Sequence, residues 1–425
     1  MLMRCLYTLL LALASPVLLF GLYRKKPGKP TFGPRWKEHW GYTPALSSAT
    51  KPIWIHAASV GESLAVIPVI KALQQQYPNI PIVVTTTTST GAEQIMKLGN
   101  GVEHRYMPID FAWCVRGFLK AIQPQLFVIV ERELWLNTLT TVKQHGIPTV
   151  VINARLSARS AQGYQRARSF SQQLLAPIDQ ILCLHQDDAE RFIALGAASD
   201  KVHVTGSIKY DLTLPASLHD MAHALRQQLG AQRPVFIAAS THKGEDEHVL
   251  DAYKHIQQQY PEVMAIIVPR HPERFDQVAH LCQLRQLICA RRSHQDTVTP
   301  ATQIYLADTM GEMFIMLAAA DVCFIGGSLL GDSVGGHNVL EPAAVAKPTI
   351  TGPSYYNFAD ITNQLSQAGA VLICQDSQQL GEQICTLFAA PEQRQQMGQQ
   401  GAAVVKHNQG AIQKTLHWLT PYLAH

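Results

Sequence analysis

Residues 52–63 read Pro-Ile-Trp-Ile-His-Ala-Ala-Ser-Val-Gly-Glu-Ser, an apolar run that gives way to small and polar residues. A helical pattern follows from Glu62 to Gln76, and then a β-branched run at 82–86. A short apolar run bounded by helical stretches has the length of a buried strand. Strands that alternate with helices in this way are typical of a parallel sheet covered on both faces.

The alternation continues in two series of similar size. The first predicts further strands at residues 126–130, 148–152, 181–184 and 202–204, and the second predicts strands at 235–239, 265–268, 303–306, 322–325 and 348–351. A polar, proline-containing stretch at 210–217 separates them. One core rarely grows beyond about 300 residues, so this α/β chain of 425 residues is expected to form two Rossmann-like domains that face a cleft.

The expected division has three parts. Residues 1–30 form an anchor and a basic juxtamembrane segment, residues 31–210 form the N-terminal domain, and residues 211–425 form the C-terminal domain. The last 30 residues have the pattern of amphipathic helices, which we expect to close the second domain.

Composition excludes several classes of protein. The net charge of +4 is small, and basic residues do not alternate with aromatic ones, so we expect no nucleic-acid partner. The eight cysteines form no C-x-x-C pair, which favours buried thiols in a reducing compartment. No H-E-x-x-H or comparable spacing occurs among the 18 histidines, so the sequence predicts no metal site.

The N-terminal segment is apolar enough to bind a membrane. Residues 5–23 carry no charge and are long enough to cross the hydrocarbon core. A basic cluster follows, formed by Arg24, Lys25, Lys26 and Lys29. Since positive residues prefer the cytoplasmic side, the body of the chain is expected there. A cleaved signal peptide fits less well because the cluster follows the apolar run. Pro16 leaves open whether the segment spans the membrane or lies in its interface.

Acidic side chains follow two predicted strands in the first half. Glu62 comes after the strand at 52–57, beside Ser59 and Gly61. Glu131 and Glu133 follow the strand at 126–130, and their spacing alone does not rank them. Ligands of open α/β sheets bind at this edge. The alternative for Glu62 is a carboxylate that complements a helix dipole, and the alternative for Glu131 is a helix cap.

Cations follow the next strands. Arg155 and Arg159 lie after the strand at 148–152, where guanidinium groups could bind phosphate, although an ordinary basic helix face has the same pattern. Lys209 follows the strand at 202–204 and could either project into the cleft or cap the linker.

Four strand ends of the second half bear residues suited to a nucleotide. Glycine-rich turns before a helix can cradle phosphate, and a following glutamate can accept bonds from a ribose. The candidates are Arg270 and His271 after the strand at 265–268, Gly311, Glu312 and Met313 after the strand at 303–306, Ser328 after the strand at 322–325, and Asn338, Val339, Leu340 and Glu341 after the Gly335-Gly336 turn.

The motifs at these positions resemble one known family over almost the full length of the chain. They are, in order, the apolar N-terminal segment, HAASVGE, ERELWLN, NARLSARS, TGSIKYD, STHKGE, VPRHPERF, DTMGEM, GGS and GGHNVLEP. The family is that of the 3-deoxy-D-manno-octulosonic acid (Kdo) transferases of lipopolysaccharide biosynthesis. The resemblance implies a GT-B fold, CMP-Kdo as donor, a tetraacyl disaccharide bisphosphate precursor of lipid A as acceptor, and neither metal nor other cofactor.

The resemblance also implies roles for individual residues. Glu62 matches the general base, and Glu131 and Lys209 match positions that support the transition state. Ten residues match the donor pocket: Arg270, His271, Gly311, Glu312, Met313, Ser328, Asn338, Val339, Leu340 and Glu341. Four others would contact the acceptor: Ser59, Gly61, Arg155 and Arg159.

The departures from the family pattern are modest. Leu136 stands where relatives often have proline, Ala58 is at a variable position, and the loop at 330–334 is slightly long. None of these changes removes a functional group.

The implied reaction is an inverting transfer at the cytoplasmic face of an anionic inner membrane. The N-terminal domain would rest on the membrane and bind the lipid's phosphates, and the C-terminal domain would bind CMP-Kdo. A nucleotide-sugar epimerase of the same fold would not need residues 5–23. A binding protein without turnover would not need Glu62.

Overall fold

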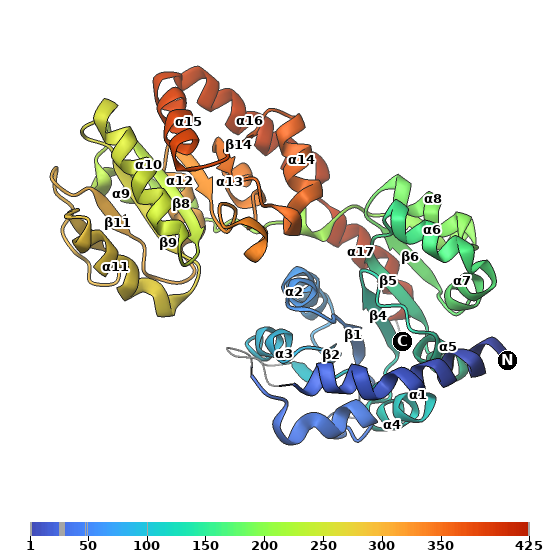
Figure 1. Ribbon diagram of the computed structural model, residues 1–425. Helices are drawn as coiled ribbons and strands as arrows, with labels where there is room; N and C mark the ends of the chain where they lie inside the picture. Colours follow the sequence, from blue (N-terminus) through green and yellow to red (C-terminus); the bar gives the residue numbers. More distant parts are fainter. Residues whose placement is uncertain (1, 25–29, 47, 49, 100, 424–425) are drawn as a thin grey trace. The chain divides into compact units, whose positions relative to one another are not determined.

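Two seven-stranded parallel sheets organise the computed structural model, which describes residues 2–24, 30–46, 48, 50–99 and 101–423 (Figure 1). Lys25, Lys26 and Lys29 of the predicted basic cluster therefore lie outside the described residues. The chain divides into two compact units, of which the first contains residues 1–211 and 408–425 and the second contains residues 212–407.

The sheet of the first unit has the strand order β3-β2-β1-β4-β5-β6-β7. Its strands are β1 (Ile53–His56), β2 (Ile82–Thr86), β3 (Val102–Tyr106), β4 (Leu126–Val130), β5 (Thr149–Ala154), β6 (Gln180–Cys183) and β7 (Val202–Val204). The chain winds outward in opposite directions from the β1–β4 pair. The loops after these two strands therefore flank the topological switch point, where open α/β sheets bind their ligands.

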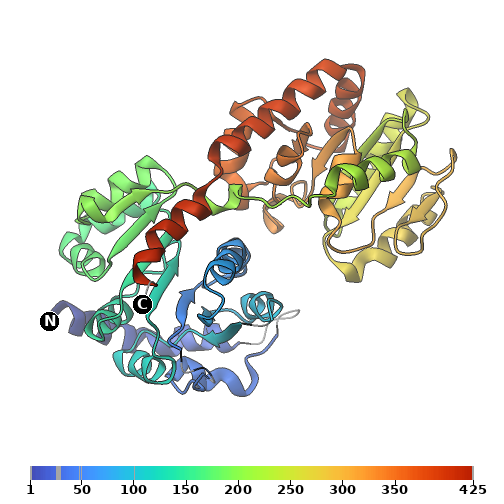
Figure 2. The ribbon, with the colours of Figure 1, turned by 180° about the vertical axis from the view of Figure 1, so that it is seen from behind.

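Helices cover both faces of this sheet (Figures 1 and 2). They are α1 (Leu2–Tyr23), η1 (Gly33–Trp40), α2 (Val60–Gln76), α3 (Ser89–Met96), α4 (Ala112–Ile122), α5 (Leu136–Gln144), α6 (Ala158–Arg166), α7 (Arg168–Leu175), α8 (Gln186–Ala194), η2 (Ser199–Lys201), η3 (Ile208–Tyr210), α17 (Ala411–Leu419) and η7 (Thr420–Tyr422). Alternate residues of the central strands enter two separate apolar clusters, one on each face. This burial on both faces explains why the central strands read as continuous apolar runs.

The sheet of the second unit has the order β10-β11-β9-β8-β12-β13-β14, so its switch point lies between β8 and β12. Its strands are β8 (Val235–Thr241), β9 (Met264–Pro269), β10 (Cys289–Arg291), β11 (Ile304–Leu306), β12 (Val322–Ile325), β13 (Thr349–Thr351) and β14 (Val371–Ile373). Its helices are α9 (Leu218–Leu229), α10 (Glu245–Gln259), η4 (Pro272–Arg274), α11 (Phe275–Leu284), α12 (Met313–Ala319), η5 (Gly331–Ser333), α13 (Leu340–Ala344), η6 (Tyr356–Phe358), α14 (Ala359–Gln367), α15 (Ser377–Ala389) and α16 (Pro391–Asn408).

The strands that the sequence did not predict are β3, β10 and β14, and each lies at the edge of its sheet. An edge strand is exposed along one side and needs fewer apolar residues. β3, for example, reads Val-Glu-His-Arg-Tyr and is only partly buried. The pattern of buried runs therefore identified every inner strand and the edge strand β7, and it missed the other three edges.

The C-terminal helix α17 belongs to the first unit, whereas the sequence led us to expect one domain over residues 211–425. The chain returns to the first unit after residue 407, and Ile412, Leu416 and Leu419 of α17 enter an apolar cluster with β1 and α2. The carboxylate of Asp211 accepts hydrogen bonds from the N–H groups of Gly410 (2.6 Å) and Ile412 (2.5 Å) at the start of α17. An amphipathic pattern shows which face of a helix is buried but not which core receives it.

Candidate active site

Glu62 lies in the first turn of α2, at the carboxyl end of β1. Its carboxylate accepts hydrogen bonds from the Ala58 N–H (2.7 Å) and the Ser59 hydroxyl (2.9 Å). Ser59 is the N-cap of α2 and accepts a bond from the Glu62 N–H (3.3 Å). This reciprocal pair is close to a capping box. Glu62 thus stabilises the N-terminus of α2, which is the structural alternative that the sequence left open. A catalytic role would come in addition to this one.

The protonation of Glu62 is perturbed by its surroundings. Burial raises the pKa of this carboxyl, the hydrogen bonds from Ser59 and Ala58 oppose the rise, and the charges of Glu131 and Glu133 add to it. The carboxylates of Glu131 and Glu133, after β4, therefore interact electrostatically with Glu62, after β1, across the switch point. A carboxyl with a raised pKa beside other carboxylates is a candidate proton acceptor.

The loop after β4 carries Glu131 and Glu133. Glu131 has φ = 65°, a left-handed conformation that is unfavourable for a residue with a side chain and is often found at functional sites. Its N–H continues the sheet by donating to the Ile152 carbonyl (2.9 Å). Glu133 accepts a bond from the Trp135 indole (3.2 Å), and the Trp135 ring contacts that of His56 at the end of β1 (5.6 Å between centroids). Ring packing therefore joins the end of β1 to the loop after β4.

The ends of β5 and β7 are joined by an asparagine. Asn153 is also left-handed (φ = 52°), and its side-chain oxygen accepts a bond from the Ile208 N–H (3.3 Å). Ile208 begins η3, the short helix that carries Lys209 and packs against α2. Lys209 thus stands on a helix that packs against α2, which carries Glu62 in its first turn. Arg155 and Arg159 are exposed after the same strand.

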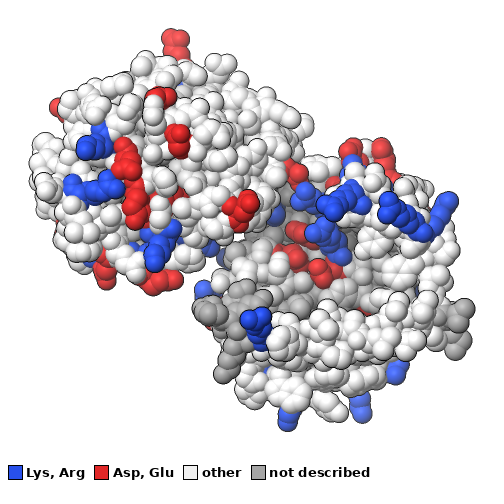
Figure 3. Space-filling model, in the orientation of Figure 1, with Lys and Arg blue, Asp and Glu red and all other residues white. Residues whose placement is uncertain are grey.

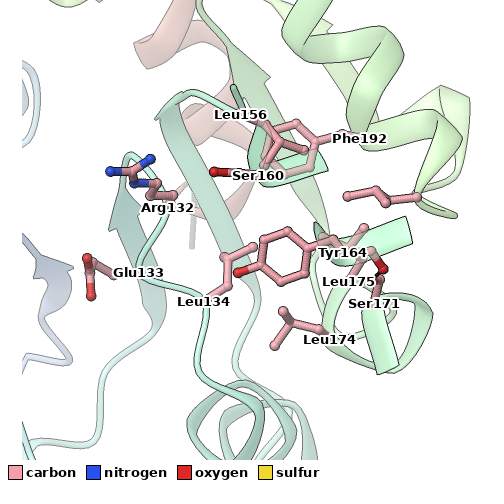
Figure 4. Close-up of a pocket in the computed structure, with 11 residues that line it drawn as sticks. Arg132, Glu133, Leu134, Leu156, Ser160, Tyr164, Ser171, Leu174, Leu175 and Phe192 are labelled. Carbon is pink, nitrogen blue, oxygen red and sulfur yellow. Dashed lines mark hydrogen bonds between the residues drawn. The ribbon is translucent and has the colours of Figure 1, made fainter. Parts of the chain in front are cut away.

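A cavity of about 230 Å³ opens beside Glu133. Figure 4 shows the Tyr164 ring among leucine side chains and Phe192, with Arg132 and Glu133 to one side. Apolar side chains form most of the lining, so the cavity is largely apolar: Leu134 from the loop after β4, and the buried Leu156, Leu174, Leu175, Phe192 and Leu195 from the segment after β5. Figure 3 shows acidic side chains gathered beside basic ones on the first unit. Because Arg132 and Glu133 also line it, the apolar cavity adjoins charged side chains.

Three histidines and an arginine gather at the strand ends of the second unit. The Nε2 atoms of His242, after β8, and His337, after the Gly335-Gly336 turn, are 2.7 Å apart, and the His242 ring packs edge to face against His271 (5.2 Å). Burial lowers the pKa of His242 to about 4, with the charges of His271, Arg274 and Arg270 adding to the effect. Burial likewise lowers the pKa of His337 to about 3, and the charges of His242, Arg270 and His271 add to this effect. The cluster is positive through Arg270 while both partly buried histidines stay neutral, so an anion would be favoured here.

Glu245 fixes the glycine turn that follows β12. Its fully buried carboxylate accepts bonds from the N–H groups of Gly327 (2.6 Å), Ser328 (3.0 Å) and Leu329 (3.0 Å). Gly327 has φ = 70°, and a Cβ there would meet the His337 ring at 2.8 Å. The turn therefore requires glycine where it approaches the histidine cluster.

The predicted donor residues have different environments. The Asn338 amide donates to Glu341 (3.3 Å), and burial raises the pKa of Glu341 against the effects of Asn338 and Arg270. These residues therefore belong to the cluster around Arg270. The Ser328 hydroxyl is fully buried and is used within the fold, since it donates to the Ile325 carbonyl and accepts from the Gly352 N–H (both 2.8 Å).

The remaining donor candidates are less directly connected to that cluster. The side chains of Val339 and Leu340 are fully buried, which leaves only their backbone for a ligand. Glu312 is bound by Arg292 (2.8 Å), whose hydrogen bond is the main reason for the lowered pKa of this carboxyl. Gly311 is left-handed (φ = 86°) and exposed, and Met313 begins α12.

Four residues that organise these sites were not predicted from the sequence: Asn153, His242, Glu245 and His337. His242 lies in the motif STHKGE and His337 in GGHNVLEP. Both motifs follow strands of the same predicted sheet, and that shared position could have indicated that the two histidines lie close together. Asn153 and Glu245 act through hydrogen bonds between elements, which a linear pattern does not reveal.

The two α/β units, each with a parallel sheet that carries polar side chains at its strand ends, have the architecture of the GT-B fold. A solved UDP-GlcNAc 2-epimerase from Neisseria meningitidis bound to UDP-GlcNAc shares this fold with a TM-score of 0.54 at 13% identity, covering 87% of this chain and 100% of that one. The model of the 3-deoxy-D-manno-octulosonic-acid transferase family matches residues 34–212.

Full-length relatives identify the family. A 3-deoxy-D-manno-octulosonic acid transferase from Haemophilus influenzae is 37% identical over 423 residues, which are 99% of each chain. Another from Bordetella pertussis is 33% identical over 436 aligned positions, again 99% of each chain. The chain belongs to the family of Kdo transferases, which are glycosyltransferases of lipopolysaccharide biosynthesis.

Proposed function

We propose that this transferase moves Kdo from CMP-Kdo to the lipid A precursor lipid IVA, with inversion and without a metal ion, at the cytoplasmic face of the inner membrane. The observation that supports the proposal most strongly is the group of Glu62, Glu131 and Glu133 at the β1–β4 switch point, where the pKa of Glu62 is raised. Membership of the Kdo transferase family specifies the sugar, and the group of carboxylates supplies a base.

Glu62 is the proposed general base. An acceptor hydroxyl loses its proton to the Glu62 carboxylate as its oxygen bonds to the anomeric carbon of Kdo. The bond from that carbon to the phosphate oxygen breaks at the same time, and CMP leaves with the electron pair. A single displacement from the face opposite the leaving group inverts the anomeric configuration. General base catalysis of this kind typically contributes about 10²–10⁴-fold in rate.

Glu131 and Lys209 are proposed to stabilise the transition state. Positive charge develops on the sugar ring as CMP departs, and a fixed carboxylate such as Glu131 stabilises it. The Lys209 ammonium would neutralise the carboxylate of Kdo. Two observations support these assignments, since each fixes the backbone beneath a charged side chain: the left-handed conformation of Glu131, and the bond that the Ile208 N–H, beside Lys209, donates to Asn153.

The cluster around Arg270 is the proposed site for the CMP phosphate. A bound phosphate would be neutralised by Arg270 and would raise the pKa of His242 and His337, so that a histidine could take up a proton. These cations would make a divalent metal unnecessary for departure of CMP. Asn338 and Glu341 would bind ribose hydroxyls, and backbone groups at Gly311–Met313 and 328–340 would complete the donor pocket.

The acceptor is proposed to bind the first unit. Arg155 and Arg159 would bind its phosphates, and half-buried Ser59 and exposed Gly61 would contact the sugar next to Glu62. The apolar cavity beside Glu133 is suited to hydrocarbon from one of its acyl chains. An apolar N-terminal helix of 22 residues supports binding to the membrane that contains such an acceptor.

Kdo transfer from CMP-Kdo to tetraacyl lipid IVA in detergent, with EDTA and then with added Mg²⁺, tests the proposal. The expected result is transfer at equal rates in both media, with an inverted anomeric centre in the product by NMR. A requirement for Mg²⁺ would reject the metal-free mechanism, and a product with retained configuration would reject the single displacement. Failure of wild-type enzyme to transfer in either medium would reject this donor and acceptor pair.

A further inference from the structure

The helix α1 lies along the first unit and is held there at both ends. Near its start, Arg4 donates to the Asn137 side-chain oxygen (2.8 Å) and to the Thr141 hydroxyl (3.0 Å), both on α5. At its last residue, the Tyr23 hydroxyl is 3.0 Å from His39 Nδ1 on η1. Figure 1 shows α1 running along the unit beside α5.

The buried carboxylate of Asp110 binds the first half of α1. The Tyr7 hydroxyl donates to Asp110 (2.7 Å), whose side chain also accepts from the N–H groups of Asn137 (3.2 Å) and Thr138 (2.6 Å). Asp110 is 4% exposed and Asn137 is 1% exposed. The Asn137 amide donates in turn to the Thr8 hydroxyl (3.0 Å). Polar partners this deeply buried hold the helix specifically, because removing α1 would leave hydrogen-bonding groups unpaired.

The opposite face of α1 is apolar and uncovered. Its exposed large side chains are each between 55% and 75% exposed: Leu6, Leu9, Leu10, Leu13, Val17, Leu18 and Phe20. A helix that is bound to the protein on one face and is apolar and uncovered on the other can bury the uncovered face in a membrane interface.

Aromatic side chains extend this surface beyond the end of α1. The Tyr23 hydroxyl donates to the Trp36 carbonyl (3.5 Å), and Trp36 borders a shallow apolar hollow together with Trp40, Tyr42 and Trp113. Trp36, Tyr42 and Trp113 are 44%, 72% and 49% exposed. Tryptophan and tyrosine favour the headgroup level of a bilayer, and Lys37 in the same hollow suits anionic headgroups. This composition favours a phospholipid surface as the partner.

A membrane-spanning arrangement is incompatible with these contacts. Crossing the hydrocarbon core would separate the ends of α1 by about 30 Å along the membrane normal. Arg4 and Tyr23, however, are both bound to the same folded unit. We propose that α1 lies in the plane of the cytoplasmic membrane surface, docked on the first unit through Asp110 and Asn137, and does not cross the bilayer.

The docking has a consequence for the candidate active site. Asn137 is in the first turn of α5, directly after the loop that carries Glu131 and Glu133. The residue that binds Arg4 and Thr8 therefore belongs to the ERELWLN segment, and the helix in the membrane surface sets the position of these carboxylates relative to the lipid. The proposal rests on membrane binding, which belongs to the proposed function, and adds how the helix is arranged.

Two epitope tags on the full-length chain test the topology. One tag is joined at the N-terminus and one at the C-terminus through protease-cleavable linkers, and protease is added to inverted vesicles and to spheroplasts. Docking in the plane predicts that both tags are cleaved only from the cytoplasmic side. Cleavage of the two tags from opposite sides would overturn the proposal and leave membrane binding intact. Recovery of the chain in the soluble fraction would instead reject membrane binding itself, and the in-plane arrangement with it.

Cross-linking tests the docked contact in the membrane. In a background with Cys5 and Cys289 changed to Ser, which leaves only buried thiols among the described cysteines, Thr8→Cys is paired with Thr141→Cys, one turn after Asn137 on α5, and treated with a short bis-maleimide. Asp110 and Asn137, which hold the helix, stay unchanged in this pair. The matched control pairs Leu13→Cys, on the exposed face, with the same partner. The expected result is efficient cross-linking of the first pair only. Equal or absent cross-linking of both pairs, in chains that still transfer Kdo, would overturn the docking.

Discussion

Glu62 combines a structural and a proposed chemical role in one carboxylate. It accepts hydrogen bonds at the start of α2 and is the proposed base. The two roles are compatible because each carboxylate oxygen has two lone pairs and uses one of them here. They are also coupled, since each hydrogen bond that secures the helix lowers the basicity of the group.

Replacing Ser59 with Ala separates the two roles. In wild type, the hydrogen bond from the Ser59 hydroxyl lowers the pKa of the Glu62 carboxyl. Ser59→Ala removes that bond, so the pKa of Glu62 should rise. A base acts only when deprotonated, and the acidic limb of the kcat/KM profile should therefore move to higher pH. Thr88→Ala is the control because Thr88 caps α3 in the same way without contacting Glu62. Identical pH profiles for the two variants would contradict this coupling.

His56 makes the first unit sensitive to acid. It is fully buried at the end of β1, with Nδ1 3.1 Å from the Thr85 carbonyl, and burial lowers its pKa to about 4. The unfolded chain, with a histidine pKa near 6.5, binds the proton more tightly. Keeping the His56 ring neutral therefore costs no stability above about pH 6.5. As the pH falls from there to about 4, protonation of the unfolded chain lowers the free energy of unfolding, by about 2 kcal/mol at pH 5.

Urea unfolding of wild type and His56→Gln at pH 7 and pH 5 measures this loss. The fall in stability between the two pH values should be smaller in the variant, whatever its stability at pH 7. An equal fall in both proteins would mean that His56 is not protonated on unfolding.

At the scale of the element, η1 is held on the sheet by a charged network. Arg35 binds Glu38 through two bonds (2.6 and 3.0 Å) and also the His104 ring (3.0 Å), while Glu38 accepts from the Tyr106 N–H (2.7 Å). Glu38 is 4% exposed, so its charge depends on these partners. The network fixes the element that carries Trp36 and Trp40.

Arg35→Ala should destabilise the first unit by about 2 kcal/mol, since it leaves the buried Glu38 carboxylate without its cation. Arg116→Ala, which removes an exposed arginine from α4, should change stability by less than about 0.5 kcal/mol. Unfolding in urea, followed by tryptophan fluorescence, compares the two variants. Similar midpoints would show that the network contributes little.

The contrast between β4 and β3 shows how far the sequence predicts this fold. The buried run Leu126–Val130 identifies its strand and, with it, the loop of Glu131. Polar edge strands such as β3 lack that signal. The candidate carboxylates were predictable because parallel strands end at one edge of a sheet. The docking of α1 on Asp110 and the pairing of His242 with His337 depend on contacts between distant segments, so they required the structure.

At the scale of the whole molecule, tryptophan distribution separates the two units. The chain has six tryptophans, at positions 36, 40, 54, 113, 135 and 418, and all belong to the first unit. The α17 helix belongs to that unit as well, although it follows the whole of the second unit in the sequence. Tryptophan fluorescence therefore follows unfolding of the first unit alone.

Leu416→Ala and Leu387→Ala test this division. Both remove a buried leucine, one from α17 (4% exposed) and one from α15 of the second unit (fully buried). Each should cost about 2–5 kcal/mol in its own unit. Only Leu416→Ala should shift the tryptophan transition in urea, and an equal shift with Leu387→Ala would show that the units unfold together.

The most direct test of the account is the turnover number of Glu62→Gln in Kdo transfer from CMP-Kdo to lipid IVA. Glutamine keeps an oxygen that can accept the Ala58 N–H bond, so α2 should stay capped while the base is lost. Glu93→Gln, an exposed change on α3, is the matched control and should retain wild-type activity. The account predicts that Glu62→Gln lowers kcat by about 10²-fold or more. A Glu62→Gln enzyme with close to wild-type turnover would contradict it and leave Glu62 as a helix cap alone.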